Sequence, residues 1–158
     1  MSTLDPNSVN VVIYHADCTD GFGAAYSAWK QLGNRAEYYA CKHGDIPPVV
    51  KGKNVAILDF SFDNETTKKM IEDAESLIVI DHHKSAVVAL HDITETKFDM
   101  SKSGAMLKWK KLMAIEKTIL AFNGTFLEPK KGLEIKNAES LIEFKKNKNR
   151  CSIKKFSS

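Results

Sequence analysis

Four short segments rich in β-branched or aromatic residues recur through the first two thirds of the chain. They cover residues 9–14, 35–40, 54–58 and 76–80, and polar or glycine-bearing turns lie between them. Segments of this length and composition are typical of β-strands. The spacing between them leaves room for a helix or a loop after each strand.

Helical patterns fill two of these gaps. Residues 24–32 contain strong helix formers and an apolar stripe that stops at Gly33. A second helix is predicted through Ile71, with Asp63 as its N-cap. Alternating strands and helices of this length predict an α/β fold, with a mostly parallel sheet covered by helices.

The second half of the chain predicts helices and a basic tail. One helix is expected from residue 101 or 103 to 116, extending to 122, and another near residues 137–146. The chain thus divides into a core, residues 1–122, and an extension, residues 123–158. From Lys130 onward there are nine Lys or Arg against three Glu. This short helical, basic tail is expected to be partly disordered, and it either stays solvated or attracts phosphate backbones.

Composition narrows the class of protein. The three cysteines, Cys18, Cys41 and Cys151, are scattered and form no CxxC pair. This argues against a disulfide framework or a structural zinc site, so reduced thiols are expected. No apolar run is long enough to cross a membrane, and the first residues lack a signal-peptide pattern. A cytoplasmic protein without a membrane partner is therefore expected.

Acidic and histidine residues directly follow three of the predicted strands. In chain order they are His15, Asp17, Asp20, Asp59, Asp81, His82 and His83. The carboxyl ends of parallel strands meet at one edge of a sheet, where ligands bind. Any one of these acids could be a turn former or a helix N-cap. Together, however, carboxylates in one crevice repel each other, and a shared cation would stabilise them.

The kinds of ligand predict the kind of metal. Carboxylate oxygens with some imidazole, and no thiolate placed among them, suit Mn²⁺ or Mg²⁺. Two such ions bridged by a carboxylate would activate water and hold a phosphoryl oxygen for in-line displacement. Phosphoester hydrolysis is the reaction that this pattern predicts.

Three segments resemble the first three motifs of the DHH phosphoesterase superfamily. They are residues 15–25 (HADCTDGFGAA), 58–60 (LDF) and 80–84 (IDHHK), and residues 98–105 resemble the stretch that follows the third motif. The resemblance covers residues 9–109. It implies a DHH-type Rossmann-like domain with two metal ions. The implied substrate is a small nucleotide or a short single-stranded oligonucleotide.

The resemblance also implies roles for the metal ligands. His15 and Asp17 resemble ligands of one ion, Asp20 and His82 resemble ligands of the other, and Asp59 resembles the carboxylate that bridges them.

Catalytic and substrate-binding roles are implied by the same resemblance. His83 would face the substrate phosphate, and Asp81 would either bind metal or orient an imidazole. Gly21, Ser103 and Gly104 would contact phosphate through the backbone. A plain tight turn at Gly21 and a simple helix start at Ser103 stay open.

The sequence departs from the family pattern in its C-terminal part. A fourth motif would supply another Asp to the second metal, but no Asp follows Asp99 and no glycine-rich substrate-binding domain is visible. We therefore expect that an internal segment is missing and that the second metal site is incomplete. An active phosphoesterase and an impaired remnant that binds metal, nucleotide or nucleic acid without turnover both stay open. A metal-free dinucleotide-binding fold is the third alternative. Exposed apolar surface would favour a homodimer or poor folding.

Overall fold

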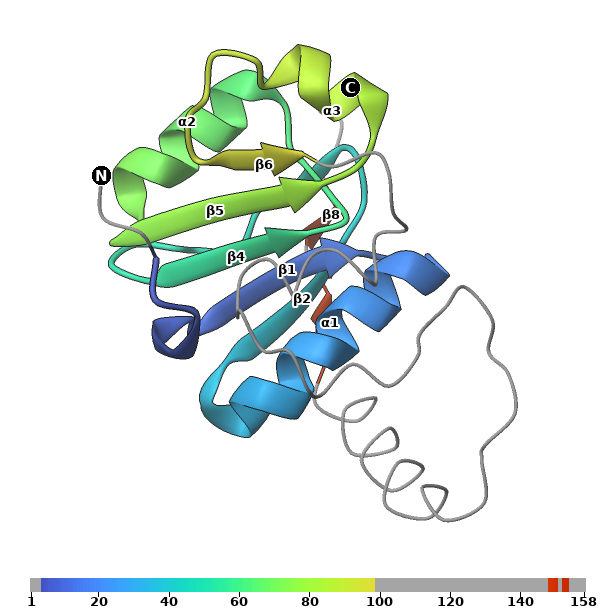
Figure 1. Cartoon of the computed structure of the whole chain (residues 1–158), viewed down its shortest axis with the longest axis vertical. Coiled ribbons are helices and arrows are strands. Elements are labelled where there is room, and N and C mark those ends of the chain that lie inside the picture. The colour runs from blue at the N-terminus through green and yellow to red at the C-terminus, as the bar shows by residue number, and fades with distance from the viewer. Residues whose placement is uncertain (1–3, 99–147, 151, 154–158) are drawn as a thin grey trace.

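The protein is built around a six-stranded sheet. The structure is a computed structural model that describes residues 4–98 and the backbone of residues 148–150 and 152–153. The strand order is β6-β5-β4-β1-β2-β7, and every neighbouring pair is parallel (Figure 1). The strands are β1 (Val11–His15), β2 (Glu37–Cys41), β4 (Asn54–Leu58), β5 (Ser76–Asp81), β6 (Thr96–Phe98) and β7 (Lys148–Arg150). The predicted α/β fold with a mostly parallel sheet is thus confirmed.

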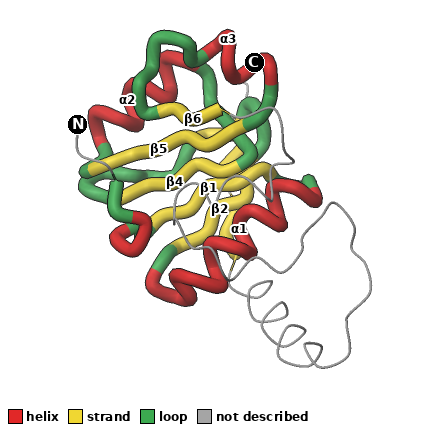
Figure 2. Tube along the Cα trace, viewed as in Figure 1, coloured by secondary structure: helices red, strands yellow, loops and turns green. Residues whose placement is uncertain are grey.

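Helices cover both faces of this sheet (Figure 2). They are α1 (Thr19–Leu32), α2 (Asn64–Asp73) and α3 (Lys84–Ala89), and short 3₁₀ turns lie at Pro6–Ser8 and Gly33–Arg35. Successive residues of each strand point to opposite faces, so the core has two halves. No helix in the described part of the chain is both long and apolar enough to cross a membrane.

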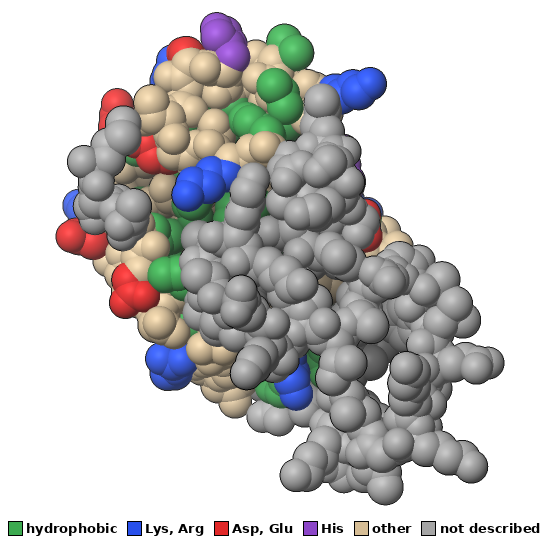
Figure 3. All heavy atoms as spheres, in the orientation of Figure 1, with side chains coloured by type: hydrophobic (Ala, Val, Ile, Leu, Met, Phe, Trp, Pro, Cys, Tyr) green, Lys and Arg blue, Asp and Glu red, His purple; other side chains and the backbone are tan. Residues whose placement is uncertain are grey.

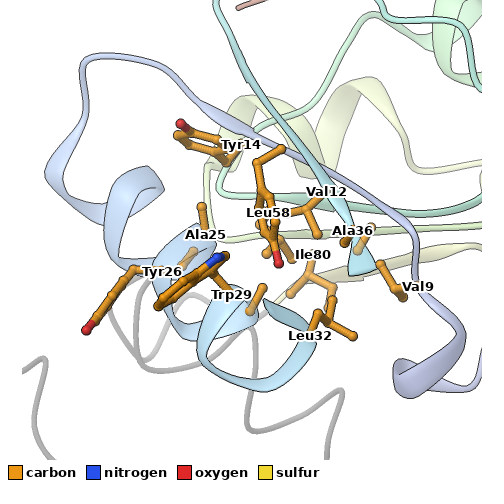
Figure 4. Close-up of a cluster of buried hydrophobic side chains, with 14 of the residues drawn as sticks. Val9, Val12, Tyr14, Ala25, Tyr26, Trp29, Leu32, Ala36, Leu58 and Ile80 are labelled. Atoms are coloured by element: carbon orange, nitrogen blue, oxygen red, sulfur yellow. The ribbon is translucent and has the colours of Figure 1, made fainter. Parts of the chain in front are cut away.

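The two halves of the core hold different helices. On one face, Trp29 and Leu32 of α1 pack with Val12, Leu58 and Ile80 of the strands (Figure 4). On the other face, Met70 of α2 and the segment after α3 pack against the alternate strand residues. The main members of that second cluster are Val11, Ile13, Val55, Ile57, Val79, Met70, Leu90 and Ile93. Residues on both faces of the strands are therefore buried, which is why the strands read as near-continuous apolar runs.

Some element boundaries differ from the predicted ones. Helix α1 begins at Thr19 instead of residue 24, because the glycines at 21 and 23 are helical residues and not part of a turn. Helix α3 and strand β6 were not predicted. By contrast, α2 has its predicted N-cap, since the Asp63 carboxylate accepts hydrogen bonds from the Thr66 amide at 2.8 Å and the Thr66 hydroxyl at 2.9 Å.

Part of the predicted tail contributes strands. β7 pairs with β2 at the edge of the sheet, and β8 (Ser152–Ile153) pairs antiparallel with β3 (Asp45–Ile46). The sequence pattern predicted none of these pairings. The helices predicted at 101–122 and 137–146 lie outside the described residues.

Cys41, the last residue of β2, is disulfide-bonded. The expectation of reduced thiols is therefore wrong for this residue. Its bonding partner lies outside the described residues. Sequence spacing missed the disulfide because spacing alone does not show which cysteines approach each other in the fold.

Asp92 links α2 to the turn before β6 and carries a pH-dependent prediction. Its carboxylate accepts hydrogen bonds from Lys68 Nζ and Asn64 Nδ2, both at 2.6 Å. The Lys68 bond, then the Asn64 bond, lower the pKa of Asp92 from 3.8 to about 2. A carboxyl with a lowered pKa in the folded state stabilises the protein fully above its unfolded pKa, and this contribution is lost as the pH falls through the folded pKa.

Asp92→Asn is therefore expected to lower the melting temperature at pH 7 by about 1–2 °C, as for an exposed ion pair. The difference between the native protein and the variant should shrink as the pH falls from 3.8 to about 2. Thermal melts of both proteins across this range test the prediction. A difference that stays constant from pH 7 to pH 2 would contradict it.

Candidate metal centre

The direction in which the chain adds strands reverses between β1 and β4. These strands are neighbours, but the chain leaves β1 through α1 toward β2 and leaves β4 through α2 toward β5, on opposite sides and faces (Figure 1). A reversal of this kind opens a ligand-binding crevice at the carboxyl ends of the two strands. The residues that directly follow β1 and β4 therefore lie where a ligand is expected.

Asp59 directly follows β4 and is completely buried. Its amide donates a hydrogen bond to the Ile80 carbonyl at 3.0 Å, and its φ of 57° is a left-handed conformation that Asp adopts more readily than most residues. Oδ1 lies 3.0 Å from His82 Nε2, whereas Oδ2 lies 3.5 Å from Cys18 Sγ. The two oxygens face different side chains, which is the arrangement that a bridging carboxylate needs.

Asp81, at the end of β5, holds the two histidines that come after it. Its Oδ1 accepts hydrogen bonds from the amides of His82 at 2.7 Å and His83 at 3.3 Å, and lies 2.7 Å from His83 Nδ1. Asp81 is buried, whereas the His83 side chain is 44% exposed. Because Nδ1 is engaged, Nε2 of His83 is the nitrogen left for a metal or a substrate. Of the two roles open for Asp81, its contacts favour orienting an imidazole.

His15 ends β1 and lies over an aromatic floor. Its ring centroid is 5.8 Å from that of Phe60, a buried residue two positions after the end of β4. The Nδ1 atom is buried, and it has no hydrogen-bond partner in the described structure. Burial lowers the pKa of His15, and the nearby Asp59 carboxylate only partly opposes this. The imidazole is therefore kept neutral at neutral pH, which is the form that binds metals.

Cys18 is a functional candidate that the sequence pattern did not supply. It immediately precedes α1, is half-buried and is not in a disulfide. Its sulfur lies 3.5 Å from Asp59 Oδ2. The structure thus brings a thiol next to a candidate ligand, which the sequence analysis did not expect. The available signal was its position inside the first motif, between Asp17 and Asp20.

The residues after β2 add two more side chains that were not predicted. Lys42 Nζ lies 2.6 Å from Asp17 Oδ2, and both side chains are about half exposed. The His43 ring centroid is 5.9 Å from that of His15 and 5.1 Å from that of Phe60. Because β2 is parallel to β1 and next to it, its carboxyl end adds basic groups to the rim of the same crevice.

Two groups of side chains in the described residues could each hold a cation, and they share Asp59. One consists of Asp59, Asp81, His82 and His83, and the other of His15, Cys18 and Asp59. Within each group the candidate ligand atoms lie within 4.8 Å of one another. The structure thus brings five of the seven predicted acidic and histidine residues together.

The remaining predicted site residues are placed differently. Asp17 pairs with Lys42, Asp20 lies in the first turn of α1, and neither joins the two groups just defined. Gly21 lies against His15, and a Cβ atom added there would be 2.3 Å from the His15 carbonyl oxygen. Ser103 and Gly104 lie outside the described residues.

Comparison with known proteins gives one distant relative. The chain is 29% identical over 127 residues to an uncharacterized protein of Acanthamoeba polyphaga mimivirus, in a match that covers 69% of this chain. The chain spans only 30% of the length of that relative. No family model matches the chain. No solved structure matches it either.

Proposed function

We propose that this chain is a metal-dependent phosphoesterase of the DHH type, with Mn²⁺ or Mg²⁺ as its cofactor. The observation that carries the proposal is the fully buried Asp59, which reaches His82 with one oxygen and Cys18 with the other. Oxygens of Asp59 and Asp81, both buried, lie within 4.8 Å of each other. Two buried carboxylates this close disfavour each other unless a cation or a proton is shared. The DHH-type Rossmann-like domain assignment is part of the same proposal.

In the proposed hydrolysis, a bound cation and the side chains of the protein would have different roles. A bound divalent ion would activate water and withdraw charge from a phosphoryl oxygen. Asp59 and His82 would hold it. With Asp81 engaging its Nδ1, His83 would donate a hydrogen bond from Nε2 to a phosphate oxygen or to the leaving group when both ring nitrogens carry a proton. The basic groups Lys42 and His43 lie on the rim, where they favour an anionic substrate.

A small nucleotide or a short single-stranded oligonucleotide is the substrate class we propose. On the face shown in Figure 3, the described Lys and Arg side chains are scattered among acidic ones and do not gather into one patch. Long nucleic acids bind through many phosphate contacts, whereas a short substrate needs few. The crevice between β1 and β4 suits a ligand that places one phosphate at the metal.

Metal-dependent turnover tests the proposal. The purified chain is incubated with Mn²⁺ and either a nucleoside p-nitrophenyl phosphate or a short single-stranded oligonucleotide. We expect hydrolysis that disappears with a chelator and in Asp59→Asn, and that persists in Asp92→Asn, which removes an acid outside the site. If no phosphoester is hydrolysed by a chain that binds Mn²⁺, the proposal of an active enzyme is wrong.

An impaired remnant that binds metal or nucleotide without turnover is the second candidate. Two observations favour it. No Asp follows Asp99 to supply a further ligand, and Asp17 and Asp20 lie outside the two groups that share Asp59. Loss of a carboxylate ligand weakens metal binding and loosens the positioning on which phosphoryl transfer depends. The same assay separates the two candidates, because a remnant binds Mn²⁺ but releases no product.

A further inference from the structure

The Cys18 thiol has no structural task that its contacts reveal. Cys18 occupies the N-cap position of α1, but its side chain makes no capping hydrogen bond. It points instead to Asp59 Oδ2, 41 residues away in the sequence, at 3.5 Å. A thiol is a weak hydrogen-bond donor, so this contact alone does little to stabilise a buried carboxylate. A thiol that contacts a buried carboxylate and does not cap its helix suggests that both groups bind one ligand.

A second observation at the same place is the orphaned nitrogen of His15. Its Nδ1 atom is buried without a hydrogen-bond partner in the described part of the chain. Buried polar atoms are normally paired with protein, water or an ion, so an exception needs an explanation. One ring nitrogen of His15, the Cys18 sulfur and an Asp59 oxygen lie within 4.8 Å of one another. An ion held by these three would give the imidazole, the thiol and the carboxylate a common partner.

We infer that His15, Cys18 and Asp59 form a half-site for a thiophilic divalent cation of the zinc class, with the Cys18 sulfur as a ligand. The inference rests on the proposed metal centre and deepens it, because it assigns the two half-sites different metal preferences. The other half-site, which includes Asp59 and His82 and no thiol, offers oxygen and nitrogen, which suit Mn²⁺ or Mg²⁺. The half-site of Cys18 offers nitrogen, sulfur and oxygen, which select a softer ion. The thiol gives up its proton to solvent when the ion binds.

Cys18→Ser is the matched variant for this inference. Serine keeps a small polar side chain and is a preferred N-cap residue, so the variant is expected to fold. It replaces the sulfur with a harder and weaker ligand. We expect the affinity for Cd²⁺ to fall by roughly 100-fold or more in Cys18→Ser, because losing a ligand costs more than the roughly 10-fold to 100-fold lost with a group that only supports one. The affinity for Mn²⁺ should change by less than about 3-fold, because the half-site without the thiol is intact.

Cobalt absorption gives a readout that does not depend on activity. Co²⁺ bound through a thiolate shows a sulfur-to-cobalt charge-transfer band in the near ultraviolet. We expect this band in the native chain, titrated without thiol reductants so that the Cys41 disulfide stays intact, and its loss in Cys18→Ser. Cys18→Ala should behave like Cys18→Ser.

The outcomes separate this inference from the proposed function. If Co²⁺ and Mn²⁺ bind but the band is absent or persists in Cys18→Ser, the thiol is not a ligand and the inference fails. The proposed phosphoesterase then still stands on its own turnover assay. If no divalent cation binds the native chain, the proposed metal centre and this inference fail together.

Discussion

Asp59→Asn is expected to abolish saturable Mn²⁺ binding while leaving the metal-free protein at least as stable as the native one. The amide keeps the size of the carboxylate, and Asn also tolerates the left-handed backbone at φ 57°. It removes a buried negative charge that has an Asp81 oxygen within 4.8 Å. Relief of that repulsion and desolvation should raise the unfolding free energy by about 1–3 kcal/mol.

Added Mn²⁺ should stabilise the native chain but not the Asp59→Asn variant. A cation that binds the folded chain at one hundred times its Kd stabilises it by about 2.7 kcal/mol. The native chain should therefore melt at a higher temperature with Mn²⁺, and Asp59→Asn should not. Calorimetric titration and thermal melts, each with and without Mn²⁺, measure the two effects. A variant that is at least as stable as the native chain without metal, yet does not bind Mn²⁺, has not lost binding through misfolding.

Asp59→Ala serves as the control for backbone strain. Alanine also removes the ligand, but a β-carbon without a polar group is less favourable at positive φ, by about 1–2 kcal/mol. We expect Asp59→Ala to lose metal binding and to be less stable than Asp59→Asn. Saturable Mn²⁺ binding that survives in both variants would move the metal centre away from Asp59.

Local sequence pattern predicted the sheet and much of the candidate site. Strand β4 has the predicted bounds, and β1, β2 and β5 lie within one or two residues of theirs, because buried parallel strands are short apolar or aromatic runs. The predicted N-cap of α2 is confirmed for a similar reason, since a capping Asp acts on the residues next to it. His15, Asp59 and the residues after β5 meet because parallel strands end at one edge.

The features that were missed depend on contacts between distant segments. Cys18 and Asp59 are neighbours only because β1 and β4 are adjacent at the crevice, which local pattern does not specify. Lys42 and His43 join the rim because β2 pairs with β1. Strand β7 likewise involves a segment far along the chain.

The sequence left two interpretations of Gly21 open, backbone contact with a phosphate or a plain tight turn. Substitution of this glycine is the second change with a large expected effect. Gly21→Ala is expected to destabilise the fold by about 2–4 kcal/mol, because α1 approaches the end of β1 too closely for a side chain. An added Cβ would be 2.3 Å from the His15 carbonyl oxygen, 2.8 Å from His15 Cβ and 3.0 Å from the His15 carbonyl carbon. Two of these atoms are backbone, so the clash is relieved only if α1 or β1 moves.

Denaturant unfolding of Gly21→Ala measures this loss, and Gly52→Ala is the matched control. Gly52 has a φ of 65° and nothing within 4 Å of an added Cβ, so alanine there should cost only about 1 kcal/mol of backbone strain. The shift at Gly21 should also displace His15, so Cd²⁺ affinity should fall in Gly21→Ala and stay unchanged in Gly52→Ala. If Gly21→Ala were as stable as Gly52→Ala, close packing of α1 on β1 would not be the reason for glycine at this position, and backbone contact with a substrate phosphate would become the better explanation.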